Sequence, residues 1–301
     1  MSAKILDGRA VASRLWRDLS ERVTALDEES PPRLAIVRFE GNGPAEVYAA
    51  SLSRAARSIG VEPVEVLPPA GASLKDVAAR IGSLNRDPLV SGIVVAQPLA
   101  EHLETPDVLA LIDPSKDVDG ATPLNVGTLA RGEAAFAPAT ALAVMAILRT
   151  YDIPIAGRRA VVVGRSAVVG RPVASLLLGA DASVEICHSR TRNLARETRR
   201  AEILVVAAGV PNLIRSEMVN RSATVIDCGI NTTPDGIVGD VDYARVRPVV
   251  SAITPVPGGV GPVTTMMLLE QTVLAAERAH EERRHHAERF SVPGRTPAKE
   301  R

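Results

Sequence analysis

The sequence predicts an α/β protein of two domains, each built on a parallel sheet. Its 301 residues exceed the usual size of a single domain. Short, uniformly apolar runs alternate with segments of helical periodicity, which is typical of parallel strands covered by helices on both faces. This alternation restarts after Pro138, so we place a three-layer α/β domain at residues 1–138 and a second βα domain at 139–263. A helix over about 264–281 is expected to return to the first domain, with a flexible tail at 282–301.

The first domain opens with a helix, because Val11, Leu15 and Leu19 recur every four residues and Asp7 can cap the start. Pro44 suits the first position of a second helix, which ends at Gly60. The remaining pattern predicts strands over 33–39, 61–67 and 92–98, a helix from Ser73 to about Asn85, and a helix that opens at Thr105.

The second domain begins with a helix that Thr140 can cap. Four apolar runs then predict strands, namely RRAVVVG (158–164), ASVEIC (182–187), ILVVAA (203–208) and ATVIDCG (223–229). A last apolar helix begins near Val263. Beyond Glu281 the apolar periodicity ends, which predicts the solvated tail.

The composition excludes several classes of protein. Lys plus Arg and Asp plus Glu are both 35, so the basic excess that nucleic acids and membrane surfaces demand is missing. Two cysteines, Cys187 and Cys228, cannot form a disulfide framework or a Cys-rich zinc site, and no other metal cluster is visible. No apolar run reaches the roughly 18 residues of a membrane span, and the N-terminal residues lack a signal-peptide core. We therefore expect a cytoplasmic protein without a metal.

A nucleotide site is predicted where the strand RRAVVVG runs into the next helix. Gly164 and Gly170 flank this turn, and the N–H groups at the helix start can hold a pyrophosphate. The spacing departs from G-x-G-x-x-G, because Ser166 takes the middle glycine position and the last glycine comes one residue late. Taken alone, such glycines could also make only a tight turn.

The following strand favours NADP over NAD. It ends in His188, Ser189 and Arg190, where an NAD site would place an Asp or Glu on the ribose 2′-hydroxyl. A hydroxyl and a guanidinium, joined by Arg165, suit a 2′-phosphate instead. The alternative is that these arginines are ordinary surface residues.

A third candidate element is the loop TPVPGGVGPVT at residues 254–264. Its interleaved glycines and prolines fit neither a strand nor a helix, and such loops let a ligand approach the main chain closely. A structural turn is the simpler alternative.

Together these segments resemble the bifunctional methylenetetrahydrofolate dehydrogenase/methenyltetrahydrofolate cyclohydrolase family. The resemblance is carried, in the order of the family, by PAEVYAASLSRAARSIGV (44–61), GIVVAQPLA (92–100), PSKDVDGATPLNVGTLARG (114–132), VVVGRSAVVGRPVASLLL (161–178), CHSRT (187–191), VIDCGIN (225–231), GDVD (239–242) and ITPVPGGVGPVTTMMLLE (253–270). It implies a Rossmann-type NADP domain, a tetrahydrofolate cleft between the domains, and commonly a homodimer.

The resemblance also implies roles for individual residues. Asp119 matches the residue that grips the pterin ring, and Tyr48 matches the active-site tyrosine. We expect the folate also to meet the 254–264 loop at Pro257, Gly258 and Gly259. The expected cofactor contacts are Gly164, Arg165, Ser166, Gly170, Ser189, Arg190, Ile230 and Thr140.

The chain departs from the family at the groups that surround the reacting carbon. The catalytic lysine of the family lies four residues after the tyrosine, on the same helix face, and that position is Leu52 here. The glutamine that works with the lysine is replaced by Ala96, and Gln97 would point to the opposite face of a strand. In the loop PATALA (138–143), Ala141 and Ala143 stand where the family has proline and glycine.

These departures affect the two reactions of the family differently. Oxidation of methylenetetrahydrofolate needs orientation, whereas hydrolysis of the methenyl product needs acid–base help, whose loss typically costs about 10²–10⁴-fold. We therefore predict an NADP-dependent dehydrogenase whose cyclohydrolase activity is weak or absent. The alternatives are a fully bifunctional enzyme with a substitute base, for which Lys116 is the nearest candidate, a diverged enzyme for another substrate, and a protein that only binds folate or NADP.

Overall fold

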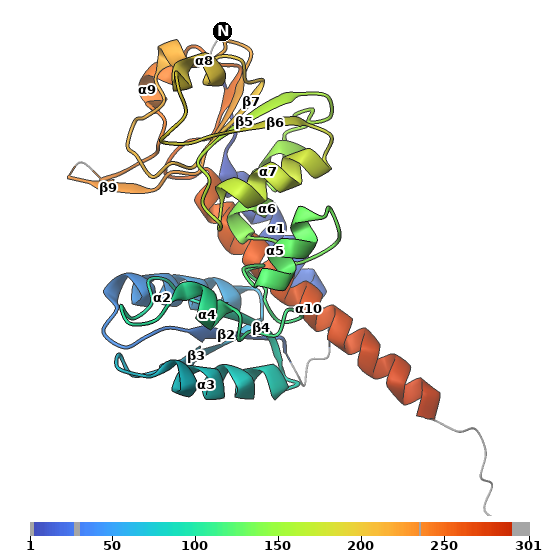
Figure 1. Cartoon of the computed structure of the whole chain (residues 1–301). Coiled ribbons are helices and arrows are strands. Elements are labelled where there is room, and N and C mark those ends of the chain that lie inside the picture. The colour runs from blue at the N-terminus through green and yellow to red at the C-terminus, as the bar shows by residue number, and fades with distance from the viewer. Residues whose placement is uncertain (1–2, 27–30, 235, 291–301) are drawn as a thin grey trace, which may run out of the picture.

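The computed structural model describes residues 3–26, 31–234 and 236–290 and divides them into two lobes, each with its own parallel sheet. Helices α1 (Gly8–Thr24), α6 (Ala139–Thr150) and α10 (Val260–Phe290) pack on one another between the sheets (Figure 1). The two-domain α/β class predicted from the alternation of apolar runs is therefore confirmed.

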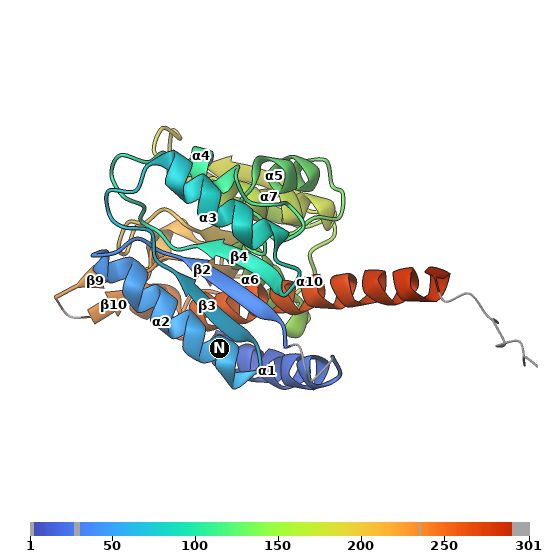
Figure 2. The ribbon, with the colours of Figure 1, turned by 90° about the horizontal axis from the view of Figure 1, so that it is seen from below.

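The first lobe is a three-layer α/β unit. Its sheet has the order β3-β2-β4, with β2 (Arg33–Val37) in the middle and parallel to both β3 (Glu62–Val66) and β4 (Val90–Val95). Helices α2 (Gly43–Ser58) and α3 (Leu74–Arg86) lie on opposite faces (Figure 2). Side chains alternate along β2, so Leu34 and Ile36 join the core on the α2 side while Ala35 and Val37 join the core on the α3 side.

Local hydrogen bonds explain where these helices begin. The Asp7 carboxylate accepts the N–H of Arg9 at the start of α1, as predicted. Ser73 and Asp76 form a capping box at the start of α3. Asn42 caps α2, which begins at Gly43 and so places Pro44 one residue further into the helix than expected. The lobe is completed by the short helices α4 (Thr105–Leu109) and α5 (Pro123–Ala130).

The second lobe contains a six-stranded parallel sheet of Rossmann type. Its order is β1-β11-β8-β7-β5-β6, so the chain moves from β5 to β6 on one side and then to β7 on the other. Ligands bind beside the carboxyl ends of strands at such a reversal. The strands of this sheet are β1 (Lys4–Ile5), β5 (Arg159–Val163), β6 (Ser183–Cys187), β7 (Ile203–Val206), β8 (Thr224–Asp227) and β11 (Ala252–Ile253). The helical elements of the lobe are α7 (Gly170–Gly179), α8 (Leu194–Thr198), a 3₁₀ turn (Ser216–Met218) and α9 (Tyr243–Val246). The lobe also contains a hairpin of β9 (Asn231–Thr233) and β10 (Gly236–Val238).

The N-terminal strand corrects the predicted domain boundary. We assigned residues 1–138 to the first domain, but β1 pairs with β11 at the edge of the second sheet. A strand of two residues is too short to produce an alternation in the sequence, so its partner could not be predicted. The chain therefore starts in the second lobe and crosses to the first through α1.

Helix α10 returns to the first lobe, as predicted. The Gln271 side chain is buried, donates to the carbonyls of Val118 (2.6 Å) and Ala137 (2.9 Å), and accepts the N–H of Ala137. On the other side of the helix, Arg22 of α1 forms two hydrogen bonds with the Glu277 carboxylate. These contacts fix α10 against the first lobe and against α1.

Three predicted boundaries of the central helices were wrong. Helix α6 begins at Ala139 after Pro138, so Thr140 lies inside the helix and does not cap it. Helix α10 begins at Val260, three residues before the expected Val263. It also continues to Phe290, where a tail was expected after Glu281; the charged residues 281–285 are exposed but helical. Glu, Arg and Ala have high helix propensity, so the helix propagates without a buried face. The rest of the expected tail, 291–301, lies outside the described residues.

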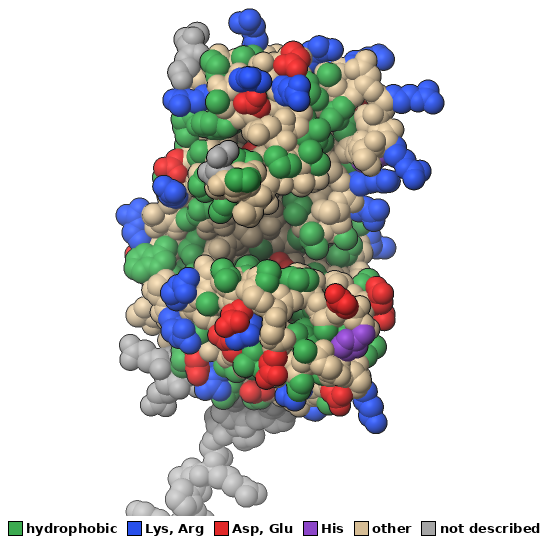
Figure 3. Space-filling view, turned by 90° about the vertical axis from the view of Figure 1, so that its left-hand side faces the viewer, with side chains coloured by type: hydrophobic (Ala, Val, Ile, Leu, Met, Phe, Trp, Pro, Cys, Tyr) green, Lys and Arg blue, Asp and Glu red, His purple; other side chains and the backbone are tan. Residues whose placement is uncertain are grey.

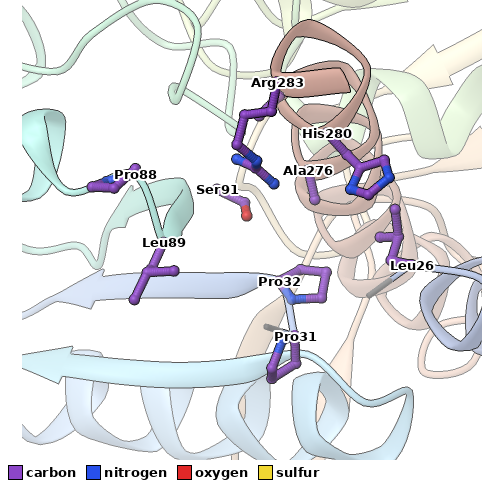
Figure 4. A pocket seen from close by; sticks show the side chains of 10 residues that line it. Leu26, Pro31, Pro32, Pro88, Leu89, Ser91, Ala276, His280 and Arg283 are labelled. Carbon is purple, nitrogen blue, oxygen red and sulfur yellow. The ribbon is translucent and has the colours of Figure 1, made fainter. Parts of the chain in front are cut away.

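A small cavity lies where α10 passes the first sheet (Figure 4). Its volume is about 30 Å³, and its lining includes Leu26, Pro32, Leu89, His280 and Arg283. This is about the space of one water molecule, so a folate or a nucleotide does not fit there. No helix in the described part of the chain is both long and apolar enough to cross a membrane.

Candidate functional site

A large cleft separates the two lobes on one side of the molecule. Figure 3 shows this hollow, with hydrophobic side chains along both rims. Its volume of about 810 Å³ is in the range of cofactor and substrate sites. None of the described residues that line it is a lysine, an arginine or a histidine. Both lobes and the central helices contribute to the lining, including Tyr48, Asp119, Thr140, Val168, Ile230 and Gly261.

Tyr48 projects into the cleft from α2. Its side chain is 41% exposed. Burial of the hydroxyl, and then the nearby Asp119 carboxylate, raise the pKa of Tyr48 above its ordinary value. The phenol therefore stays protonated and acts as a hydrogen-bond donor.

Asp119 faces Tyr48 from a loop that a second aspartate organises. The buried Asp117 carboxylate accepts the backbone N–H groups of Ala121 (3.1 Å) and Thr122 (2.8 Å) and the side-chain amide of Asn125 (2.8 Å). Burial, followed by the charge of Asp117, raises the pKa of Asp119 to about 7, against the lowering effect of a backbone hydrogen bond at Ala139. The sequence pattern did not reveal that Asp117 holds this loop.

Leu52 and Ala96 lie beneath the cleft surface and do not line it. Leu52 is 2% exposed and packs in the core with Ile36, Ala56 and Val94. Ala96 follows β4 and is also buried, while Gln97 beside it is exposed, in agreement with the predicted change of face. The two positions at which the family has a lysine and a glutamine thus carry buried apolar residues in this chain.

Neither the lysines of the described chain nor Arg54 lines the cleft in place of the missing amine. Lys116 donates to the carbonyls of Leu84 (3.0 Å) and Asp87 (2.6 Å) at the end of α3, and burial lowers its pKa. Lys4 donates to the carbonyl of Tyr151, and Arg54 is exposed outside the cleft lining. Lys75 belongs to the lining of neither the cleft nor its side pocket, and Lys299 lies outside the described residues.

The predicted nucleotide turn is a tight loop that requires its glycines. Gly164 has φ of +127°, and a Cβ there would overlap the Ala207 carbonyl. A Cβ on Gly170 would overlap the carbonyl of Gly164. The Ser166 hydroxyl accepts the N–H groups of Val169 (3.2 Å) and Gly170 (3.3 Å), so it organises the start of α7. This explains a serine at the middle glycine position.

Positive charge collects where β5 and β6 end. Arg165, Ser189 and Arg190 are all exposed, and neither arginine forms an ion pair within the described part of the chain. The ring Nδ1 of His188 accepts the N–H of Arg190 (3.2 Å), and the Thr191 hydroxyl accepts the N–H of His188 (2.8 Å). The backbone of this turn is therefore fixed, while its cations are free to meet an anion.

The glycine-proline loop lines a side pocket of about 200 Å³. Pro257, Gly258 and Gly259 lie there beside Arg9, and the Gly258 carbonyl accepts the N–H of Gly8 (2.9 Å). The pocket shares Cys228, Ile230, Val260 and Gly261 with the main cleft. The residues that enter the main cleft come just after the three we chose, and include Val260, Gly261, Thr264 and Thr265. They belong to the same sequence block, but only the start of α10 at Val260 reveals which of them face the cleft.

Ile230 and Thr140, two of the expected cofactor contacts, both line the main cleft. Gly164, Arg165, Ser166 and Gly170 do not line this cleft, whereas the residues between them, Ala167, Val168 and Val169, do. Among the described residues, no three His, Cys, Asp or Glu side chains gather into a group that could hold a metal ion.

Comparison with known families finds one family over most of the chain. A sequence model described as "Tetrahydrofolate dehydrogenase/cyclohydrolase, catalytic domain" matches residues 6–119. A second, described as "Tetrahydrofolate dehydrogenase/cyclohydrolase, NAD(P)-binding domain", matches residues 138–280. The second match includes residues 260–280 of α10, the helix that we predicted to return to the first domain.

Individual relatives cover almost the same span. A protein named Bifunctional protein FolD from Acidiphilium cryptum is 47% identical over 92% of this chain and 99% of its own length. The crystal structure of the bifunctional methylenetetrahydrofolate dehydrogenase/cyclohydrolase FolD from Campylobacter jejuni superposes with a TM-score of 0.90 at 40% identity, covering 92% of this chain and 99% of that one. A Trypanosoma brucei dehydrogenase-cyclohydrolase, complexed with NADP and an inhibitor, has a TM-score of 0.88 at 36% identity over 93% and 99% of the two chains.

Proposed function

This chain belongs to the tetrahydrofolate dehydrogenase/cyclohydrolase family, and we propose that it oxidises methylenetetrahydrofolate to methenyltetrahydrofolate with NADP while hydrolysing the product slowly or not at all. One observation carries the proposal. The cleft keeps Tyr48 and Asp119 but has no basic side chain in its described lining. The predicted class of enzyme, an oxidoreductase of one-carbon metabolism, follows from the family.

NADP fits the second lobe. Gly164 and the start of α7 form a turn whose backbone a pyrophosphate can approach closely, and the Ser166 hydroxyl shapes that turn. Arg165, Ser189 and Arg190 would hold the 2′-phosphate, since no carboxylate occupies positions 188–190. When bound, NADP supplies the hydride acceptor of the reaction. The NADP complex of the Trypanosoma brucei relative supports this assignment.

The first lobe binds and orients the folate. In its ionised form Asp119 accepts hydrogen bonds from the N–H groups of the pterin, and the protonated Tyr48 donates a hydrogen bond near the one-carbon bridge. The nitrogen lone pairs of the folate stabilise the cation that hydride loss leaves behind, so the protein contributes mainly orientation. Neither Leu52 nor Ala96 impairs this step.

Hydrolysis of the methenyl product asks more of the protein. A water molecule must lose a proton as it attacks, and a proton must reach a folate nitrogen. Tyr48 is a poor base because its pKa is raised, and Asp119 is committed to the pterin. Because Leu52 and Ala96 are buried and apolar, we expect hydrolysis to be about 10²–10⁴-fold slower than in a site that has the lysine and glutamine of the family.

The pKa of Asp119 predicts a pH dependence. Below pH 7 the carboxyl becomes protonated and loses part of its capacity to accept pterin N–H groups, so kcat/KM for the folate is expected to fall about tenfold per pH unit and to level off above pH 7. Initial rates at saturating NADP between pH 5.5 and 8.5 measure this. A flat profile over that range would contradict the raised pKa of Asp119 and show that this carboxyl stays ionised throughout.

The basic activity is tested by following NADPH formation from methylenetetrahydrofolate with NADP, and in parallel with NAD. We expect turnover, with a higher kcat/KM for NADP than for NAD. Binding of both ligands without turnover would make the chain a binding protein. A folded protein that neither binds nor oxidises the folate would act on another substrate. The homodimer and the cytoplasmic location stay predictions, and gel filtration tests the first.

A further inference from the structure

Two buried carboxylates adjoin the cofactor side of the cleft and have no part in the reaction described above. Asp227 ends β8 in the block VIDCGIN, and Asp240 follows β10 in the block GDVD. They are 3% and 0% exposed, respectively. Neither forms an ion pair with a lysine, arginine or histidine of the described chain. Every described hydrogen-bond partner of the two carboxylates is an N–H group.

These N–H groups come from several chain segments. The Asp227 carboxylate accepts the backbone N–H groups of Gly229 (2.9 Å), Asp240 (3.0 Å) and Val241 (3.0 Å). The Asp240 carboxylate accepts those of Ala208 (2.6 Å) and Gly209 (2.8 Å), as well as the side-chain amide of Asn231 (2.8 Å). The pair thus joins the segments that follow β7, β8 and β10.

Two glycines make this approach possible, and the packing is reciprocal. A Cβ on Gly239, just before Asp240, would overlap the Asp227 carboxylate. A Cβ on Gly229, two residues after Asp227, would overlap the Asp240 carboxylate. The Asp227 carboxylate therefore occupies the space of a side chain at position 239, and the Asp240 carboxylate that of a side chain at position 229. The blocks VIDCGIN and GDVD thus form one structural unit.

This unit holds a wall of the cleft in which Cys228 packs against the core and Ile230 does not. Cys228 and Ile230 line the cleft on either side of Gly229. Ile230 is 68% exposed, so no core contact fixes its position. Burial raises the pKa of Asp227 to about 6, against the lowering effect of the backbone N–H groups of Gly229, Val241 and Asp240.

We propose that Asp227 and Asp240 are positioning residues for the cofactor, which fix the Cys228–Ile230 segment where NADP meets the cleft wall. This inference deepens the proposed function and depends on it. Because every hydrogen bond of the two carboxylates lies within the second lobe, their loss should weaken NADP binding more than it changes the contacts of the folate with Tyr48 and Asp119.

The variant Asp227→Asn tests the proposal. Since all partners of this carboxylate are N–H donors, the new NH₂ group must face one of them. We expect the Kd for NADP, measured by calorimetry, and the KM for NADP to rise about tenfold, the scale expected when a buried donor loses its partner. The KM for methylenetetrahydrofolate should stay within about twofold of wild type.

Asp242→Asn is the matched control, because it makes the same chemical change in the same segment. The Asp242 carboxylate caps α9 by accepting the N–H of Arg245 and lies outside both pockets. Its NADP affinity should equal that of wild type. If Asp227→Asn does not fold, Asn231→Ala removes the side-chain donor to Asp240, together with a longer hydrogen bond to the Val238 carbonyl, and should produce a smaller shift in the same direction.

Unchanged NADP affinity in folded Asp227→Asn or Asn231→Ala would overturn the proposal. Equal losses for NADP and folate would overturn it too, because they indicate a general loss of structure. Wild-type protein that binds no NADP would instead defeat the proposed function itself.

Discussion

The double variant Leu52→Lys/Ala96→Gln is expected to gain methenyltetrahydrofolate hydrolysis by about 10²-fold, while dehydrogenation changes little. Leu52 lies one helical turn after Tyr48 on α2, so an amine at the end of a lysine can reach toward the same part of the cleft. Hydrolysis is measured as the loss of methenyltetrahydrofolate absorbance, corrected for the spontaneous reaction. Since Leu52 is buried, the melting temperature of the variant is recorded alongside.

Ser51→Lys is the control for this gain. It adds the same charge one residue earlier on α2, about 100° around the helix, at a position that is already exposed. It should not raise hydrolysis. A gain in Ser51→Lys equal to that of the double variant would mean that added positive charge, and not an amine at position 52, supplies the missing help. A folded double variant without any gain would show that Leu52 and Ala96 do not limit the reaction.

Asp119→Asn is expected to raise the KM for methylenetetrahydrofolate about 100-fold, because a charge-assisted hydrogen bond contributes about 1.5–3 kcal/mol and the new NH₂ group faces the N–H donors of the pterin. The Kd for NADP should stay within about twofold, since the cofactor binds the other lobe. The measurement is steady-state kinetics with both substrates varied.

Asp113→Asn controls for this change on the same stretch of chain. Its carboxylate is exposed and bonds only to the neighbouring Ser115 in addition to local backbone. Folate KM should be unchanged in this variant. If Asp119→Asn binds folate as well as wild type does, then Asp119 has no role in gripping the pterin.

Much of the fold could be predicted from the sequence because its signals are local. Asp7 and Ser73 cap their helices with groups two and three residues away, and uniformly apolar runs such as 160–163 mark buried parallel strands. The errors concern features without a local signal. Strand β1 has two residues and is defined by its pairing with β11, and α10 continues past Glu281 because a packed helix extends into residues of high propensity.

The candidate site could be predicted only in part, for a similar reason. Tyr48, Asp119 and Ile230 face one cleft, as the motifs imply. The roles of Lys116 and Asp227 depend on backbone groups that the fold brings to them from other segments, and the role of Asp117 depends on how its own loop folds back on it. Which residues of the glycine-proline loop face the cleft likewise depends on where α10 begins.

The central claim is that the site keeps redox chemistry and lacks the means to activate water. The most direct test measures two rates on one preparation of wild-type enzyme. The first is the enzymatic hydrolysis of methenyltetrahydrofolate, and the second is the NADP-dependent dehydrogenation of methylenetetrahydrofolate. Our account predicts that hydrolysis runs at no more than about one hundredth of the dehydrogenation rate. Comparable rates would contradict it, because a group other than the family lysine and glutamine would then be activating water in this cleft.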